Sequence, residues 1–245
     1  MPIELKIFST REEASQSAAS SIVMALEEKP DLTLCLATGN SPTRAYELFT
    51  ASVEKSALGV GQLRLLKLDE WGGLASDDPA TCEVYLQRYL VAPLGLRREQ
   101  LVGFQSDAED LDGECLRIER HLLDADQIDV CVLGLGVNGH IGFNEPAAEL
   151  FSRAHIATLS DASLGHSMLR ETSVQTSVGL TLGMAEILAS REILLLVFGS
   201  EKAKQLKTLV EGGVTTQFPA SFLQLHSRIT CLCDRAAASQ LTLEN

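Results

Sequence analysis

Residues 32–43 have the sequence LTLCLATGNSPT, in which an apolar run passes directly into glycine and small polar residues. The run from Leu32 to Ala37 is apolar at nearly every position instead of at alternate positions, and such runs are typical of strands that helices cover on both faces. Ser41 and Pro42 then predict the cap and first turn of a helix. A strand followed at once by a helix is the repeating unit of an α/β fold.

The same alternation of strand-like and helix-like segments continues along the chain. A capping box at residues 10–13 predicts a helix through Leu26, and further helices are predicted after Asp78-Pro79, at Leu111–Leu123 and at Glu201–Val210. The predicted strands are Glu4–Phe8, Leu32–Ala37, Leu63–Leu68, Ile128–Leu133, Val178–Leu182, Ile193–Phe198 and Arg228–Cys233. No repeat, low-complexity tract or linker interrupts this pattern. We therefore expect residues 1–245 to form a single α/β domain, built on an open, mostly parallel, doubly wound sheet with helices on both faces.

Charge and hydropathy exclude several classes of function. Lys and Arg total 20 against 33 Asp and Glu, a net charge of −13. Nucleic acid is therefore not expected as a partner, because phosphate contacts need a basic face, whereas a small anionic substrate needs only one local positive site. No apolar run reaches the ~18 residues of a membrane helix and residues 1–10 lack a signal-peptide pattern, so no membrane partner is expected. The six cysteines lack the paired spacing of zinc sites, and we expect buried free thiols in a reducing cytoplasm.

Polar residues follow several of the predicted strands, where the sheet edge would bind ligands. Thr38, Gly39, Asn40 and Ser41 come directly after the strand at 32–37. Backbone N–H groups at such a helix N-terminus favour an anion, and the alternative is a plain strand-to-helix turn. The segment is not a phosphate-binding P-loop, because no Gly-Lys-Ser/Thr ending is present. Lys202 follows the strand at 193–198 and could neutralise a phosphate, unless it is a solvated surface lysine.

Two acids follow the strand at 63–68. Asp69 and Glu70 point in opposite directions if the strand continues, so one carboxylate can face the cleft easily. A carboxylate in that place could act as a general base. The alternative is an exposed loop acid.

Residues 134–146, GLGVNGHIGFNEP, follow the strand at 128–133 and contain a formal Gly-x-Gly-x-x-Gly. A dinucleotide site is not expected, because Pro146 and the loop-forming residues before it interrupt the long helix that this fingerprint needs. The segment instead presents His140 and Glu145. A histidine tuned by a carboxylate suits proton transfer near neutral pH. The His-x₄-Glu spacing does not match a zinc motif, so no metal is expected.

Together these segments resemble the glucosamine-6-phosphate deaminase family. The matching segments, in the family's order, are 37–42, 68–71, 134–146, 199–203 and 219–226. The run Gly-His-Ile-Gly-Phe-Asn-Glu-Pro at 139–146 is highly specific for the family. The related 6-phosphogluconolactonases share the fold but carry Gly-His-Thr-Ala-Ser there, so lactone hydrolysis is the alternative function. Within the family the chain looks most like bacterial galactosamine-6-phosphate deaminase/isomerases, from segments 34–39, 67–71, 81–83, 129–136 and 219–223.

The resemblance implies an enzyme that converts galactosamine-6-phosphate or glucosamine-6-phosphate to the ketose 6-phosphate and releases ammonia. By matching position, Asp69 would move a proton between C2 and C1 through an enolamine, His140 would open the sugar ring, and Glu145 would orient His140. Asn138 stands where many members have Asp, so its part is limited to hydrogen bonding. The residues expected to hold the phosphate are Thr38, Gly39, Asn40, Ser41 and Lys202. The reaction requires no cofactor or metal.

Two further expectations concern regulation and assembly. The family's phosphate-binding Arg has no secure match, although Arg170 lies near in the sequence. Ala148, His155 and Ala157 replace the Ser, Arg and Lys of the allosteric site in some relatives, so we expect no activation by N-acetylated sugar phosphate and a monomer or small homo-oligomer. A non-catalytic sugar-phosphate sensor is the third hypothesis, but such sensors usually carry an added DNA-binding domain. The sequence leaves the preference at C4 open.

Overall fold

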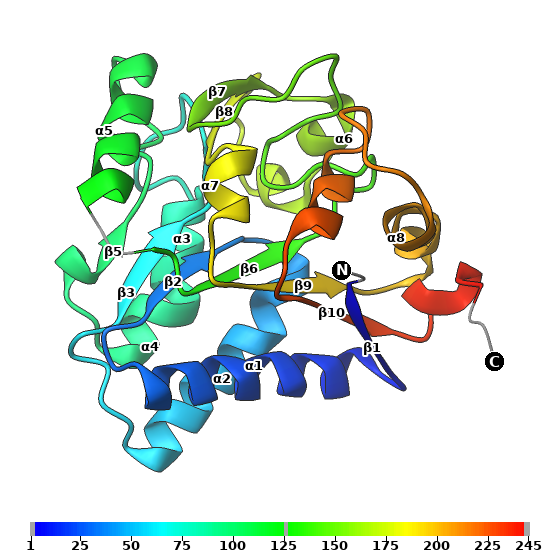
Figure 1. Ribbon diagram of the computed structural model, residues 1–245. Helices are drawn as coiled ribbons and strands as arrows, with labels where there is room; N and C mark the ends of the chain where they lie inside the picture. Colours follow the sequence, from blue (N-terminus) through cyan, green and yellow to red (C-terminus); the bar gives the residue numbers. More distant parts are fainter. Residues whose placement is uncertain (1–2, 125–126, 243–245) are drawn as a thin grey trace.

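The computed structural model describes residues 3–124 and 127–242, and its centre is a seven-stranded sheet in which every neighbouring pair is parallel. The strand order is β1 (Glu4–Phe8), β10 (Ile229–Asp234), β9 (Glu192–Val197), β6 (Val130–Gly134), β2 (Thr33–Leu36), β3 (Arg64–Lys67) and β5 (Leu101–Val102). Helices lie on both sides of this sheet (Figure 1). The expected parallel, doubly wound α/β fold is confirmed.

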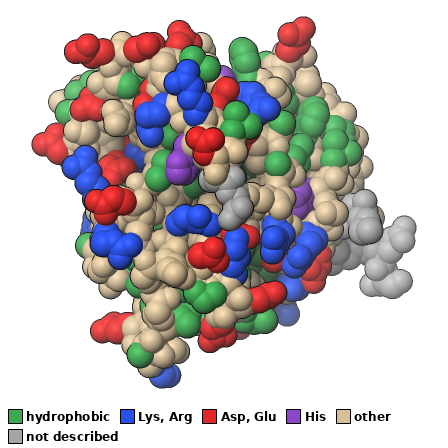
Figure 2. All heavy atoms as spheres, turned by 60° about the vertical axis from the view of Figure 1, so that its left-hand side comes forward, with side chains coloured by type: hydrophobic (Ala, Val, Ile, Leu, Met, Phe, Trp, Pro, Cys, Tyr) green, Lys and Arg blue, Asp and Glu red, His purple; other side chains and the backbone are tan. Residues whose placement is uncertain are grey.

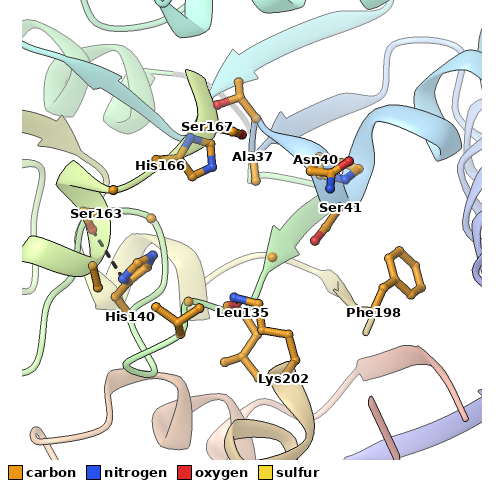
Figure 3. Close-up of a pocket in the computed structure, with 18 of the residues that line it drawn as sticks. Ala37, Asn40, Ser41, Leu135, His140, Ser163, His166, Ser167, Phe198 and Lys202 are labelled. Atoms are coloured by element: carbon orange, nitrogen blue, oxygen red, sulfur yellow. Dashed lines mark hydrogen bonds between the residues drawn. The ribbon is translucent and has the colours of Figure 1, made fainter. Parts of the chain in front are cut away.

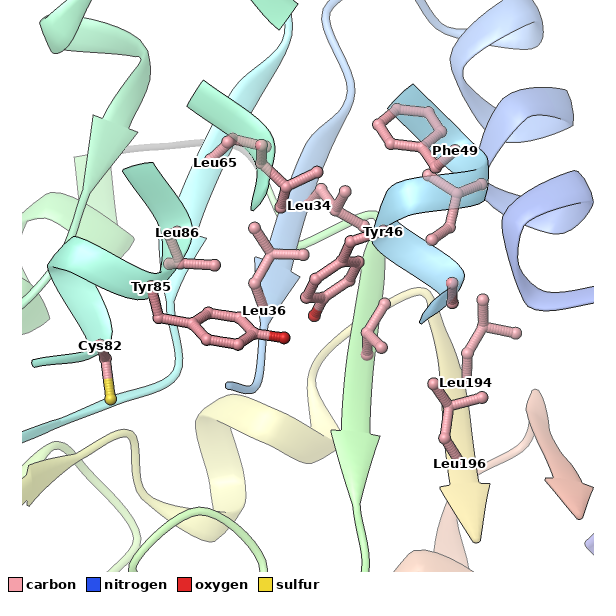
Figure 4. Close-up of a cluster of buried hydrophobic side chains, with 14 of the residues drawn as sticks. Leu34, Leu36, Tyr46, Phe49, Leu65, Cys82, Tyr85, Leu86, Leu194 and Leu196 are labelled. Atoms are coloured by element: carbon pink, nitrogen blue, oxygen red, sulfur yellow. The ribbon is translucent and has the colours of Figure 1, made fainter. Parts of the chain in front are cut away.

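Alternate side chains of the central strands enter two separate hydrophobic cores. Leu34 and Leu36 face the core under α1 and α2, where Tyr46 and Phe49 of α2 pack on them (Figure 4). Cys35 faces the opposite core, which α5, α7 and α8 cover. The helices are α1 (Arg11–Glu28), α2 (Asn40–Ser56), α3 (Cys82–Leu86), α4 (Ala92–Leu94), α5 (Leu111–Asp124), α6 (Asp161–Leu164), α7 (Met184–Leu188) and α8 (Ala203–Glu211). Burial on both faces explains why these strands are apolar at every position.

A second, three-stranded antiparallel sheet lies above the carboxyl edge of the first. Its order is β4 (Asp69–Trp71), β8 (Val178–Thr181) and β7 (His155–Thr158). The predicted strand at 178–182 therefore forms, but in this smaller sheet and not beside the parallel strands. The physical reason is that β8 pairs with β4, which continues the path of β3 past Leu68. The sequence did not predict β4, β5 or β7, because segments of two to four residues become strands only through pairing with partners distant in the sequence.

The predicted helix starts are partly corrected. Thr10 caps α1 as expected, since its hydroxyl accepts a hydrogen bond from the N–H of Glu13 at 3.2 Å. The cap of α2 is Gly39 and not Ser41, and Gly39 has a φ of +102°, which favours glycine. The helix after Pro79 begins only at Cys82, with Thr81 as its cap. Because Ser41 is not used as a cap, its side chain is free to point into the cavity described below (Figure 3).

The surface and the thiols agree with the composition. All six cysteines are buried and free, as predicted. Figure 2 shows one face of the molecule, on which Lys and Arg side chains stand among Asp and Glu side chains. In the part of the chain that the structure describes, no helix is long and apolar enough to cross a membrane.

Candidate active site

A cavity of about 500 Å³ lies at the carboxyl edge of the parallel sheet, between this edge and the segment that carries α6 (Figure 3). Its walls come from the segments that follow four parallel strands, β2, β3, β6 and β9, as the sequence predicted. They hold Thr38 and Ser41, Asp69, His140, and Lys202 respectively. The fold therefore brings four of the predicted segments, far apart in the sequence, to one site.

Asp69 is the first residue of β4 and is buried, with only 8% of its surface exposed. Burial, reinforced by the negative charge of Glu70, raises the pKa of Asp69 to about 7, although the Cys82 thiol and Lys67 act in the opposite direction. The exposed-loop interpretation is therefore wrong. A carboxyl group that is half ionised near neutral pH can both take a proton and return it.

Cys82 connects Asp69 with the segment after β2. Its Sγ lies 3.7 Å from Oδ1 of Asp69, to which it donates, and 3.1 Å from Oγ1 of Thr38. Burial and the charges of Glu70 and Asp69 raise the pKa of this thiol well above its usual range. The Cys82 side chain therefore stays protonated and holds Asp69 and Thr38 in fixed positions.

Glu70 points away from Asp69, as strand alternation predicted, and it anchors the structure below the site. It accepts a hydrogen bond from Nζ of Lys67 at 2.8 Å, with both side chains buried. It also accepts from the backbone N–H groups of Trp71, Cys82 and Glu83. Glu70 thus ties β4 to the start of α3, and the buried charge of Lys67 compensates it.

His140 lies in the glycine-rich loop after β6, with its ring against the backbone of Gly136. A Cβ at Gly136 would lie 2.4 Å from the ring, so only glycine allows this position. Nδ1 of His140 is 3.6 Å from Oε2 of Glu145 and 3.4 Å from the hydroxyl of Ser163. The predicted pairing of His140 with Glu145 is therefore present in the structure.

Glu145 is held as an anion. Burial alone would raise its pKa, but hydrogen bonds from His140, Ser163 and Asn138 outweigh burial and lower the pKa of Glu145 to about 2. Asn138 donates from Nδ2 to Oε2 of Glu145 at 2.8 Å, and its Oδ1 accepts from the N–H of His140 at 3.1 Å. Asn138 therefore links the two residues by hydrogen bonds, the limited part that the sequence assigned to it.

Four of the five residues predicted to hold phosphate line the same cavity. Thr38, Asn40, Ser41 and Lys202 line it, whereas Gly39 forms the turn behind them. Nζ of Lys202 donates to the carbonyl of Leu135 at 2.7 Å, and burial lowers the pKa of Lys202. The side chain is half-buried, and no carboxylate among residues 3–124 and 127–242 lies within ion-pair distance of it, so an anion that enters the cavity beside Lys202 would stabilise its charge.

Comparison with known proteins agrees with these motifs and their arrangement. The family model described as glucosamine-6-phosphate isomerases/6-phosphogluconolactonase matches residues 9–231. The chain belongs to this family. Its relatives include AgaI of Escherichia coli K12, provisionally described as a deaminase, at 40% identity over 89% of this chain and 86% of that protein. Glucosamine-6-phosphate deaminase 1 of Bacillus subtilis 168 is 37% identical over 94% of this chain and 96% of its own length.

Solved structures give the same family placement. A monomeric glucosamine-6-phosphate deaminase superposes with a TM-score of 0.93 at 36% identity, covering 97% of this chain and 100% of that one. A 6-phosphogluconolactonase from Trypanosoma brucei has a TM-score of 0.75 at 19% identity, with 98% and 99% covered. The lactonase likeness shows the shared fold alone.

Three cavity residues of this family member were not predicted. Arg170 lines the cavity, although its position in the sequence was not a secure match to the family's phosphate-binding Arg. Arg11 lies over the ring of Phe198, 5.3 Å from its centroid, and donates to the carbonyl of Asn40. His166 also faces the cavity. In the sequence, Arg11 stands at a predicted helix start and His166 and Arg170 stand in a polar segment. Neither pattern indicates that a side chain lines a cavity.

The remaining contacts of the site were also outside the motifs. Ser160 and Ser163 both donate to Oε1 of Glu145 from the segment around α6.

Among residues 3–124 and 127–242, no group of three or more His, Cys, Asp or Glu side chains could hold a metal ion. The cavity brings together two groups that can transfer protons, Asp69 and His140 with its partner Glu145, and the ammonium group of Lys202.

Proposed function

We propose that this protein is an amino-sugar-6-phosphate deaminase/isomerase, which converts galactosamine-6-phosphate or glucosamine-6-phosphate and water to the ketose 6-phosphate and ammonia. The observation that carries the proposal is one cavity with two separate proton-transfer centres, since Asp69 and His140 both line it. The reaction needs two, because the C2 proton becomes acidic only after the ring has opened to the aldehyde. The deaminase relatives and the deaminase structure support the same reaction.

His140 performs the first step in this proposal. It takes the proton of the C1 hydroxyl and gives a proton to the ring oxygen as the C1–O5 bond breaks, so the sugar opens to the aldehyde and the imidazole returns to its starting state. Glu145 stays ionised because its pKa is about 2, so it fixes the orientation of the imidazole without competing for the proton. Ser163 and Asn138 hold that carboxylate in place.

Asp69 performs the second step. Its carboxylate removes the C2 proton to give the enolamine and returns a proton to C1, which leaves an imine at C2. Water adds to that carbon, the C–N bond breaks, and ammonia leaves as the C2 ketone forms. A pKa of about 7 suits Asp69 for this work, because neither direction of transfer is strongly uphill at neutral pH.

The phosphate end positions the substrate. In the proposal the phosphate lies at the N-terminus of α2, with Ser41, Asn40 and Lys202 around it and Thr38 and Gly39 shaping the turn. This attachment, remote from the reacting carbons, places C1 and C2 against Asp69. No cofactor or metal takes part.

The galactosamine substrate is the finer part of the proposal, and it rests on the segments that resemble the galactosamine branch. We also propose a monomer or small homo-oligomer, supported by the similar structure that is described as monomeric. The six buried free thiols support a reducing cytoplasmic location.

The test is ammonia release from galactosamine-6-phosphate and glucosamine-6-phosphate, measured side by side, with Asp69→Asn as the control. Release from at least one sugar that is abolished in the variant supports the proposal. No release from either sugar, together with hydrolysis of 6-phosphogluconolactone, would instead assign the protein to the lactonase branch and remove the role of Asp69 as a C2 base.

A further inference from the structure

His166 stands in the cavity wall with no part in the chemistry proposed above. It precedes the 3₁₀ helix at Ser167–Glu171, and its ring points into the cavity above the ring of His140 in the view of Figure 3. Neither the motifs nor the two proton-transfer steps use it. The cavity-facing atom of this ring is therefore available to a substrate.

The hydrogen bonds of His166 fix which ring nitrogen carries the proton. Nδ1 accepts from the backbone N–H of Met168 at 3.3 Å, so the neutral ring carries its hydrogen on Nε2. Burial, with the positive charges of His140 and Lys202, lowers the pKa of His166 to about 4. The ring is thus neutral at neutral pH. No residue within 3–124 or 127–242 accepts the Nε2–H in the structure, so this group is a fixed and unused donor.

Two contacts place this donor between the ends of the substrate site. The ring lies 5.8 Å from that of Trp71, two residues after Asp69 and on the same face of the strand. Its Nε2 lies only 2.9 Å from the point where a Cβ on Gly39 would stand, at the beginning of α2. His166 therefore lies between the carboxyl group that acts at C2 and the turn that receives the phosphate at C6.

The geometry of a hexose 6-phosphate then assigns the atoms that His166 faces. The ring oxygen is directed to His140, C1 and C2 to Asp69, and C6 to the phosphate end. The remaining polar groups are the hydroxyls of C3 and C4, on the edge of the ring away from the ring oxygen. In this orientation of the substrate, His166, which lies between Asp69 and the turn at Gly39 and apart from His140, faces this edge.

We propose that His166 determines the sugar specificity by donating its Nε2–H to the hydroxyl at C4, and so discriminates between the galactose and glucose configurations. The inference rests on the proposed function, because it takes the orientation of the substrate from it. The two configurations direct the C4 hydroxyl to different faces of the ring, and a rigid donor can reach only one of them. A site built to hydrogen-bond a hydroxyl discriminates strongly against a ligand that leaves the donor unpaired.

Two substitutions separate this role from simple capping of the 3₁₀ helix. In His166→Asn, the side-chain oxygen takes the place of Nδ1 and keeps the hydrogen bond from Met168, but the Nε2–H is lost. In His166→Gln, the amide N–H₂ reaches the place of Nε2, and the cap is lost. A capping role predicts that Gln is the damaging change, whereas the specificity role predicts that Asn is.

The experiment measures kcat/KM for galactosamine-6-phosphate and glucosamine-6-phosphate in the unmodified protein and in both variants. His121→Gln, at the end of α5, is the control for loss of a histidine outside the cavity. We expect His166→Asn to change the ratio of the two values by about tenfold or more, through loss on the preferred sugar. His166→Gln should keep the ratio within about threefold of the unmodified protein, and the control should leave it unchanged.

An unchanged ratio in His166→Asn, or equal losses on both sugars, overturns the role of His166 while the deaminase function stands. If the unmodified protein releases ammonia from neither sugar, the proposed function fails and takes this inference with it. The two failures are therefore distinguishable in the same set of assays.

Discussion

The parallel sheet and the segment above it contribute to the cavity in different ways. The sheet ends in polar turns after β2 and β9, which supply Ser41 and Lys202 at the phosphate end. The overlying cap segment (residues 135–183) supplies His140 and His166, and Glu145 of the same segment lies beside His140. Asp69 stands where the two meet, in the strand that pairs with β8. The sheet therefore positions the substrate, and the cap segment supplies most of the groups that act on it or recognise it.

The parallel sheet and the cap segment also differ in how regular their secondary structure is. The sheet has a core on each face and seven parallel strands in register, whereas the cap segment has two short strands, a single-turn α-helix, a 3₁₀ helix and loops. Groups on loops are held by their hydrogen bonds more than by packing. Damage to the sheet should therefore appear first in the free energy of unfolding, and damage at the cavity first in the rate of the reaction.

The largest effect is expected for Asp69→Asn. General acid–base groups contribute about 10²- to 10⁴-fold to rate, so we expect kcat for ammonia release to fall by about 10³-fold with little change in KM. Stability should not fall, because the amide removes a carboxyl group that burial disfavours in its charged form. The measurement is steady-state kinetics together with urea unfolding. A rate within tenfold of the unmodified protein would show that another group is the base.

Glu70→Gln, one position along, should have its effect on stability. Among the residues that the structure describes, it leaves Lys67 one ion-pair partner, the partly exposed Glu83 at 3.0 Å. Breaking a buried ion pair by removing one member costs about 3–5 kcal/mol, so we expect a loss of unfolding free energy of about 3 kcal/mol. Urea unfolding measures it.

The matched control for this change is Glu12→Gln, which breaks the exposed ion pair with Arg44 and should leave stability nearly unchanged. Equal losses of unfolding free energy in the two variants would show that the buried Lys67–Glu70 pair contributes no more to stability than the exposed Glu12–Arg44 pair.

The pH dependence of kcat/KM should show the ionisation of Asp69. The base must be ionised, so activity should fall about tenfold per pH unit below pH 7. The effect of rising pH on stability is opposite to its effect on activity. The folded protein binds the Asp69 proton more tightly than the unfolded chain, so unfolding free energy falls as pH rises from about 4 to 7. Replacement of Asp69 by Asn should remove this part of the stability profile, and its persistence would contradict the assignment.

The smallest effect is expected from N-acetylglucosamine-6-phosphate. The resemblance places Ala148, His155 and Ala157 where some relatives have Ser, Arg and Lys, so we expect these three residues not to form a phosphate site. Addition of the compound should therefore leave the rate unchanged and the dependence on substrate hyperbolic. Sigmoidal kinetics that the compound relieves would show an allosteric site elsewhere in the chain.

The contrast between the parallel sheet and the cap segment also explains which features could be predicted from the sequence. Six of the seven parallel strands, all but β5, were predicted to within a few residues, because burial on both faces leaves nearly continuous apolar runs such as Leu32–Ala37. Polar turns after these strands then located Ser41, His140 and Lys202 at one edge. These are local patterns, and the topology of a parallel sheet converts them into a common site.

The cap segment was predicted far less well. β4 and β7 form because they pair with β8, and Asp69 becomes buried only because of that pairing. The contacts of Ser163 with Glu145 and of His166 with Trp71 join positions that are many residues apart. No local spacing encodes such contacts, so the roles of these side chains became visible only in the folded chain.

The hydrogen-bonded row of Thr38, Cys82 and Asp69 gives the protein a built-in vibrational reporter. The S–H stretch of a thiol absorbs in a region of the infrared spectrum that is free of other protein bands, and its frequency falls as the acceptor becomes a stronger base. Because the Cys82 thiol donates to Asp69, ionisation of that carboxyl should move this band, and a difference spectrum against Cys82→Ala would isolate it from the other five thiols. The protonation state of the proposed base can thus be followed directly, without an added label and without turnover.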